Sequence, residues 1–298
     1  MRLPLSDSRF RDLLETRARH PERVAERARE RRRRPVLGPK GTLFLVAADH
    51  PARGVLKAGD RPLAMADRRV MLERALVALE QPGVDGLLGS PDLIDDLLLL
   101  DALDEKIVLG TMNRGGLAGA TWELDDRFTA YDAESIETAG LEGGKMLLRI
   151  DLADRGTLHT IESCAAAVTS LARRRLLAVL EVLPAFRDDS GILRISKEPD
   201  DLIRGIGVGS ALGASSAYTW LKIPVVDGMD RVMAATTLPT LLLGGDPGAR
   251  AAEVFAGWRR ALSIPQVRGL VAGRALLFPP DGDVVRTVSE AAEIVHGR

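Results

Sequence analysis

Several residue types are scarce in this chain of 298 residues. It has one cysteine, Cys164, which excludes an internal disulfide framework and a cysteine-rich metal site. The formal net charge is only -1, so the overall charge gives no reason to expect nucleic acid as the main partner. The longest uncharged stretch, 205–221, is rich in glycine and serine and too polar to span a bilayer. The N-terminus begins Met-Arg-Leu-Pro and has no apolar signal core. We therefore expect a cytoplasmic protein that binds neither nucleic acid nor a membrane.

Lysine is scarce as well, because 35 of the 41 basic residues are arginine. Because this sequence uses arginine for most of its basic residues, a lysine inside an apolar strand is a notable exception and a candidate functional residue. Hydrophobic residues make up 46% and charged residues 28% of the chain, which is ordinary globular composition and argues against disorder. The length allows two average domains or one α/β barrel.

Residues 1–34 differ from the rest, with 12 arginines against six acidic residues and four consecutive arginines at 31–34. Ser6 or Asp7 can cap a helix here. The segment could be an arm for an anionic partner or a solvated helix packed on the outside of the domain. The interleaved acidic residues favour the helix, so we assign 1–40 to an N-terminal helical extension and 41–298 to the main domain. A thin apolar stripe supports this assignment: Phe10, Leu13, Leu14, Ala18 and Val24.

From residue 41 onward, short apolar runs alternate with longer stretches of helical periodicity. Runs that are apolar throughout are typical of parallel strands buried on both faces. Eight such units in about 250 residues predict an α/β protein with the (β/α)8 TIM barrel fold. An open doubly wound sheet is the alternative, but the first run is followed by Asp49-His50-Pro51 rather than a glycine-rich dinucleotide turn. The eight runs are 43–48, 84–88, 107–109, 146–150, 176–183, 218–223, 240–243 and 269–272.

Lys222 lies inside the sixth apolar run, Trp-Leu-Lys-Ile-Pro. A buried ammonium is costly unless it is paired or deprotonated. Burial and a nearby cation both lower a lysine pKa, and the neutral amine can attack a carbonyl to form a Schiff base. The structural alternative is a buried Lys–Glu pair that ties strands together. Lys145, Glu181 and Asp49 on three further strands favour catalysis, with Lys145 as second cation and the carboxylates as proton carriers.

Glycines follow the last two strands, at Gly244, Gly245 and Gly273. Barrels often bind phosphate between these two loops, through backbone N–H groups and a helix N-terminus. Arg274 can add a charge-assisted contact, whereas Asp246 would repel an anion unless it turns away. The alternative is that these glycines only form tight turns.

Of the four histidines, only His50 lies at a strand end, so a three-histidine zinc site is not available and we expect no metal. Spacing alone leaves a Mg²⁺ site of Asp49, Glu181 and Asp151 open. We expect His50 to contact a substrate hydroxyl or to support Asp49. Arg149, on the fourth strand, is a further candidate for substrate binding.

In this order, the motifs resemble the class I (Schiff-base) barrel aldolases, the group of deoxyribose-phosphate, tagatose-bisphosphate and archaeal-type fructose-bisphosphate aldolases. Asp49 with Arg53-Gly54 is similar to the tagatose branch, whereas the Asp49-His50 pair is similar to the archaeal-type fructose enzymes. The remaining matches to the tagatose branch are Lys145, Leu180-Glu181, Lys222 with Pro224, Gly244, Gly245, Gly273 and Arg274.

The resemblance implies a lyase without a metal or organic cofactor. Lys222 would form the imine, and the substrate would be a phosphorylated sugar or sugar acid. The candidates are 2-deoxy-5-keto-gluconate 6-phosphate, tagatose or fructose bisphosphate, and deoxyribose phosphate. The resemblance also extends to an actinobacterial-type aldolase found with myo-inositol catabolism. It implies that the protein assembles as a homo-oligomer. The alternatives are a catalytically silent regulator that binds sugar phosphate, and a metal-dependent barrel lyase.

Overall fold

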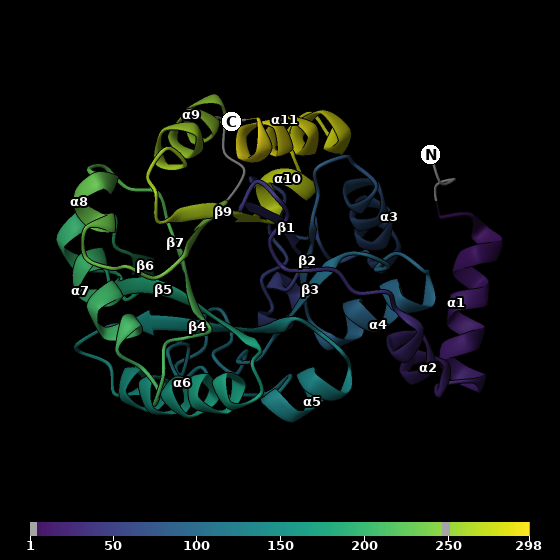
Figure 1. The fold of residues 1–298 in the computed structure, drawn as a ribbon, viewed down its shortest axis with the longest axis horizontal. Coiled ribbons are helices and arrows are strands. Elements are labelled where there is room, and N and C mark those ends of the chain that lie inside the picture. Colours follow the sequence, from purple (N-terminus) through teal and green to yellow (C-terminus); the bar gives the residue numbers. More distant parts are fainter. Residues whose placement is uncertain (1–4, 246–250, 298) are drawn as a thin grey trace.

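The computed structural model describes residues 5–245 and 251–297. Within them, eight parallel strands form a closed barrel, because β4 pairs with both β3 and β5. Figure 1 shows the strands around a common centre with the helices outside. The predicted (β/α)8 fold is confirmed. The barrel strands are β1 (Leu43–Ala47), β2 (Gly86–Gly89), β3 (Ile107–Thr111), β4 (Gly143–Ile150), β5 (Leu177–Arg187), β7 (Thr219–Ile223), β8 (Thr240–Leu243) and β9 (Val267–Ala272).

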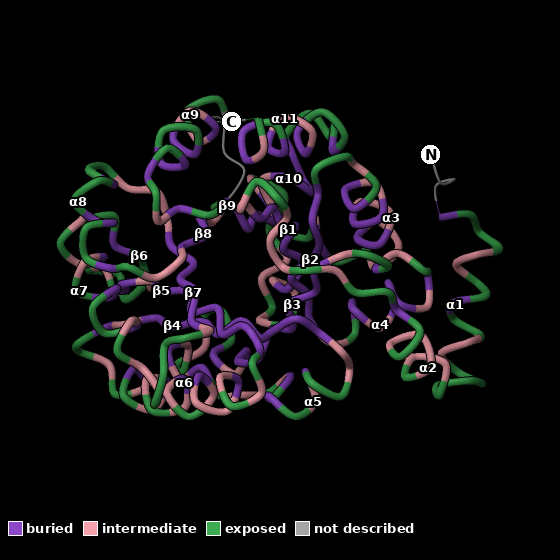
Figure 2. The backbone as a smooth tube through the Cα atoms, in the orientation of Figure 1, coloured by how far each residue is buried: buried purple, intermediate pink, exposed green. Residues whose placement is uncertain are grey.

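The strands are apolar throughout because each face meets a different part of the core. On β1, Leu43 and Leu45 point into the barrel, where they pack with Trp220 of β7, while Phe44 and Val46 belong to the core beneath the helices. Side chains alternate along a strand, so both sets are removed from water. In Figure 2 the strands are accordingly drawn as buried along most of their length.

Two of the helices between the strands, α3 and α5, begin at a side chain that caps the helix. The side chain of Asp67 accepts from the backbone N–H of Val70, and Asp132 forms a capping box with Ser135. The helices around the barrel are η1 (His50–Arg53), α3 (Arg68–Leu79), α4 (Pro91–Leu99), α5 (Ala133–Thr138), α6 (Gly156–Arg173), α7 (Pro199–Ser210), α8 (Met229–Met233), α9 (Ala251–Ala261), α10 (Arg274–Leu277) and α11 (Val284–His296). None of the helices in the described ranges is long and apolar enough to cross a membrane.

One strand was not predicted. β5 continues past the barrel and pairs antiparallel with β6 (Leu193–Ile195), so the two form a hairpin at the carboxyl end of the barrel. Its residues are largely exposed, so the segment lacks the apolar run that marks the barrel strands.

The N-terminal segment forms two helices, α1 (Asp7–Arg19) and α2 (Arg23–Glu30), at the outer edge of the molecule beside α4 (Figure 1). The four arginines that follow reach carboxylates at the amino end of the barrel. Arg31 pairs with Glu142 at 2.9 Å, just before β4, and Arg34 pairs with Asp85 at 3.0 Å, just before β2. This basic run is thus neutralised by the barrel itself.

Candidate active site

Five ionisable side chains meet at the carboxyl end of the barrel, where catalytic groups of this fold lie. Each is 8% exposed or less. Asp49 continues the inward-facing series of β1, two residues after Ala47. Glu181 and Lys222 are paired in the register of β5 and β7, so their side chains are direct neighbours. The five are Asp49, Arg114, Lys145, Glu181 and Lys222, and we call them the charge cluster.

The two lysines share one carboxylate. Lys222 Nζ donates to Glu181 Oε1 at 2.6 Å, and Lys145 contacts the other oxygen, Oε2. Lys145 Nζ also lies 3.4 Å from Asp49 Oδ2. Although Lys145 is only the third residue of β4, it is in register with Thr111, the last residue of β3, so it already stands at the carboxyl end of that strand. The structure therefore brings together all four residues predicted to be catalytic.

Arg114 is the member of the cluster that the sequence did not single out. Its Nε donates to Thr111 Oγ1 at 2.8 Å, and its Nη2 contacts Asp49 Oδ2. It lies in the long loop after β3, where no strand or helix period indicates which way a side chain points. The polar, glycine-rich composition of residues 111–116 was the available signal.

Burial and mutual charge shift the cluster's protonation. Burial is the largest cause that lowers the pKa of Lys145 well below its usual value, and the Arg114 charge adds to it. Burial also lowers the pKa of Lys222, against the raising effect of Glu181. Burial alone would raise the pKa of Glu181, but the surrounding cations outweigh it and hold that pKa well below its usual range. The arrangement favours an ionised carboxylate beside a lysine that gives up its proton readily.

His50 borders the cluster as a neutral imidazole. Its Nδ1 lies 3.9 Å from Asp49 Oδ1 and, within the described residues, is buried without a hydrogen-bond partner. Burial lowers its pKa well below the usual value, and the charges of Arg274 and Lys222 lower it further. A neutral ring with an open nitrogen can exchange a hydrogen bond with a substrate.

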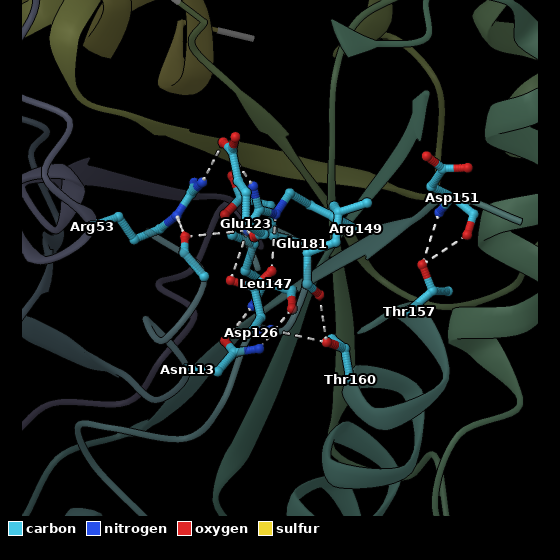
Figure 3. A network of polar contacts seen from close by, with 12 residues as sticks. Arg53, Asn113, Glu123, Asp126, Leu147, Arg149, Asp151, Thr157, Thr160 and Glu181 are labelled. Carbon is cyan, nitrogen blue, oxygen red and sulfur yellow. Dashed lines mark hydrogen bonds and ion pairs between the residues drawn. The ribbon is translucent and has the colours of Figure 1, made fainter. Parts of the chain in front are cut away.

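Arg149 has partners within the protein. Its Nε and Nη2 donate to the two carboxylate oxygens of Asp126, both at 2.9 Å, and Nη2 also donates to Gly116 O at 3.3 Å. Arg53 Nε donates to the same carbonyl at 3.0 Å, and Arg53 Nη2 lies 3.5 Å from Glu123 Oε1. Figure 3 shows these side chains converging on the loop after β3. Arg149 and Arg53 thus hold the loop that carries Arg114.

The predicted phosphate-binding residues lie at the ends of β8 and β9. A Cβ at Gly273 would stand 2.3 Å from Ala47 O, and one at Gly244 would stand 2.5 Å from Ala272 Cβ, so only glycine fits. Gly245 has a left-handed backbone, with φ of 70°. Arg274 begins α10 and donates from Nη1 to Lys57 O at 3.4 Å. Asp246 lies outside the described residues.

The remaining candidate residues give little support for a metal site or for a reactive thiol. Within 5–245 and 251–297, no three His, Cys, Asp or Glu side chains are grouped as metal ligands. Asp151 accepts from the N–H of Ala153 in its own turn. Cys164 is buried, and burial raises the pKa of its thiol to about 12, which fits packing rather than reactivity.

The fold is similar to a Schiff base forming fructose-1,6-bisphosphate aldolase (16% identity, TM-score 0.65, 92% of this chain and 100% of that chain covered). It is also similar to a fructose-bisphosphate aldolase from Slackia heliotrinireducens (17%, 0.66, 96% and 87%). At these identities the likeness shows an aldolase-like fold. Among curated proteins, none matches this sequence.

A much nearer relative has a crystal structure, that of Cgl0159 from Corynebacterium glutamicum. It is 49% identical, with a TM-score of 0.96 and 99% of each chain covered. The family model described as Cgl0159-like matches residues 41–292, which is nearly the whole barrel. The chain belongs to the Cgl0159-like family.

Proposed function

We propose that this protein is a class I aldolase that makes or breaks a carbon–carbon bond in a phosphorylated sugar or sugar acid. The observation that carries the proposal is the buried Lys145–Glu181–Lys222 arrangement at the carboxyl end of the barrel. Two lysines around one carboxylate, in a site removed from water, supply both an amine nucleophile and a proton carrier.

Lys222 is the proposed nucleophile, because its contacts leave it freer than Lys145. Burial lowers the pKa of Lys145 further than that of Lys222, but Glu181 contacts both amines, so a proton can pass from one to the other through it. Lys145 is 1% exposed and lies against two carboxylates, Glu181 and Asp49, whereas Lys222 is 4% exposed and pairs with Glu181 alone. Lys222 also stands on the strand beside β8, next to the glycine-ended loops.

The neutral amine of Lys222 attacks the substrate carbonyl carbon and gives a carbinolamine. An acid of the cluster donates a proton to the hydroxyl of the carbinolamine, which leaves as water, and a positively charged iminium remains. A carboxylate then removes the proton from the hydroxyl on the far side of the bond to be cleaved, that bond breaks, and its electron pair flows to the iminium nitrogen as an enamine. Glu181 and Asp49 carry protons, and Lys145 stabilises the oxygen that gains charge. Protonation of the enamine and hydrolysis restore Lys222.

The remaining predicted residues take roles around this centre. We assign the substrate phosphate to the loops at Gly244, Gly245 and Gly273, with Arg274 as its charged partner, and a substrate hydroxyl to His50. For Arg149 the contacts support an indirect role. It holds the loop after β3, so it would act on the substrate through that loop.

The experiment is an aldehyde-release assay with four substrates: 2-deoxy-5-keto-gluconate 6-phosphate, fructose bisphosphate, tagatose bisphosphate and deoxyribose phosphate. We expect turnover of at least one substrate, its loss in Lys222→Arg, and unchanged turnover in Lys197→Arg, whose side chain is exposed. Binding of these phosphates without turnover would instead identify a regulator. Turnover that a chelator abolishes would identify a metal-dependent lyase.

A further inference from the structure

The charge cluster has one cation more than it has anions. Among the residues that the structure describes, Arg114, Lys145 and Lys222 face only two carboxylates, those of Asp49 and Glu181. All five groups are nearly removed from water, where an unbalanced charge is expensive.

Within residues 5–245 and 251–297, the groups around the cluster do not supply the missing negative charge. Asp126 and Glu123, in the loop after β3, are already engaged with Arg149 and Arg53, so this outer set is balanced two against two. His50, on η1, is neutral. Arg274, on α10, also lowers the pKa of Lys222, but it is present in every variant described below, so differences between those variants report Arg114 and Asp49.

The three cations of the charge cluster do not share the two carboxylates equally. Arg114 binds Asp49 and is itself fixed: its Nε donates to Thr111, and its backbone N–H donates to Arg127 O at 3.2 Å. The loop cannot shift easily, because a Cβ at Gly116 would stand 2.1 Å from Glu123 O. That leaves Glu181 as the main partner of both lysines.

We propose that Arg114 is a positioning residue: it binds the same oxygen of Asp49 that Lys145 approaches, so three cations share two carboxylates and one lysine stands without its proton at neutral pH. A guanidinium keeps its proton, so the surplus charge is relieved at a lysine. This inference rests on the proposed function only for its consequence, which is an amine ready to attack. When the iminium forms, positive charge returns to the cluster while the substrate's anionic group is bound.

The test measures lysine protonation directly and needs no substrate. The chain has six lysines, so ¹³Cε-labelled lysine gives six NMR signals that can be titrated and assigned by single Lys→Arg variants. In the wild type, we expect one signal of the pair Lys145 and Lys222 to be that of a neutral amine at pH 7. In Arg114→Met the cluster is balanced, so both signals should be those of ammonium groups. Arg114 and Lys145 contact the same oxygen of Asp49, so loss of the guanidinium charge should raise the pKa of the neutral lysine.

A double variant separates charge from structure. Asp49→Asn with Arg114→Met removes one anion and one cation, so the surplus returns and one lysine should again be neutral at pH 7. Arg127→Gln, an exposed arginine of the same loop, is the matched control and should leave the titration unchanged. Circular dichroism and urea unfolding verify that each variant is folded.

Two results would overturn the inference: an unchanged lysine titration in folded Arg114→Met, or no return of the neutral amine in the double variant. Turnover is measured separately. The turnover of Arg114→Met should fall by about tenfold or more at pH 7, because the attacking amine is then protonated, and should recover toward pH 9. If the titrations behave as expected but no substrate is turned over, the proposed function fails and the charge inference stands. If the wild type turns over substrate but the titration of Arg114→Met does not move, the charge inference alone fails.

Discussion

Replacing Glu142 with alanine should destabilise the barrel far more than replacing a surface carboxylate. Glu142 Oε1 accepts from Arg31 Nη2 and from Arg33 Nε, both at 2.9 Å, and its Oε2 accepts from the N–H of Val108 at 2.7 Å. The Arg31 side chain is 1% exposed. Without Glu142 its charge stays buried with only carbonyl partners, those of Lys106 and Gly140.

Breaking such a buried pair from one side costs about 3–5 kcal/mol. The matched control is Glu15→Ala, because Glu15 pairs with Arg19 at 2.6 Å on the surface of α1, with both side chains more than half exposed. That pair is worth about 0.5 kcal/mol or less. Urea unfolding at pH 7, analysed with a common slope, gives both values. A loss below about 1 kcal/mol for Glu142→Ala would refute the structural role of the arginine run and revive its interpretation as an arm for anionic partners.

Three further outcomes follow from the site. Lys222→Met leaves two cations against two carboxylates, so folding no longer requires a lysine to lose its proton; the variant should lose imine formation, yet its free energy of unfolding in urea should rise by about 1–2 kcal/mol. Because the folded chain lowers the pKa of Lys145 and Lys222, the unfolded chain binds more protons above the folded pKa, and stability should rise from pH 7 to pH 9; a flat urea midpoint would contradict this. Gly273→Ala places a Cβ against Ala47 O, so we expect calorimetry to show weaker phosphate binding and the free energy of unfolding to fall by about 2 kcal/mol. The control is Gly282→Ala, whose Cβ would have nothing within 4 Å and which should leave phosphate binding intact.

The barrel could be predicted because its strands are buried on both faces and therefore read as unbroken apolar runs. A charged residue inside such a run is conspicuous, and this signal correctly brought Glu181 and Lys222 together. The hairpin of β5 and β6 gave no such signal, because its residues face water.

The sequence could not reveal the partners of the arginines. Arg149 is conspicuous in the sequence for the same reason as Lys222, because it is a cation within an apolar strand. Its partner Asp126, however, lies 23 residues earlier in an irregular loop, where no pattern in the sequence indicates the contact. Arg114 sits in that loop as well, so its contact with Asp49 depends on how the loop folds back over the barrel. Arg31 and its neighbours had the composition of an anion-binding arm, and their partners became visible only once the amino ends of β2 and β4 were placed.

The central claim is that Lys222 forms an imine, and borohydride trapping tests it most directly. The protein is incubated with dihydroxyacetone phosphate and then with each proposed sugar phosphate, reduced with borohydride, digested and examined by peptide mass spectrometry. We predict a stable adduct on Lys222, with an added mass equal to that of the donor carbonyl compound less one oxygen atom, and none in Lys222→Arg. An adduct on Lys145 would mean that the two lysines have exchanged roles, and no adduct with any of these carbonyl compounds would contradict the imine mechanism itself.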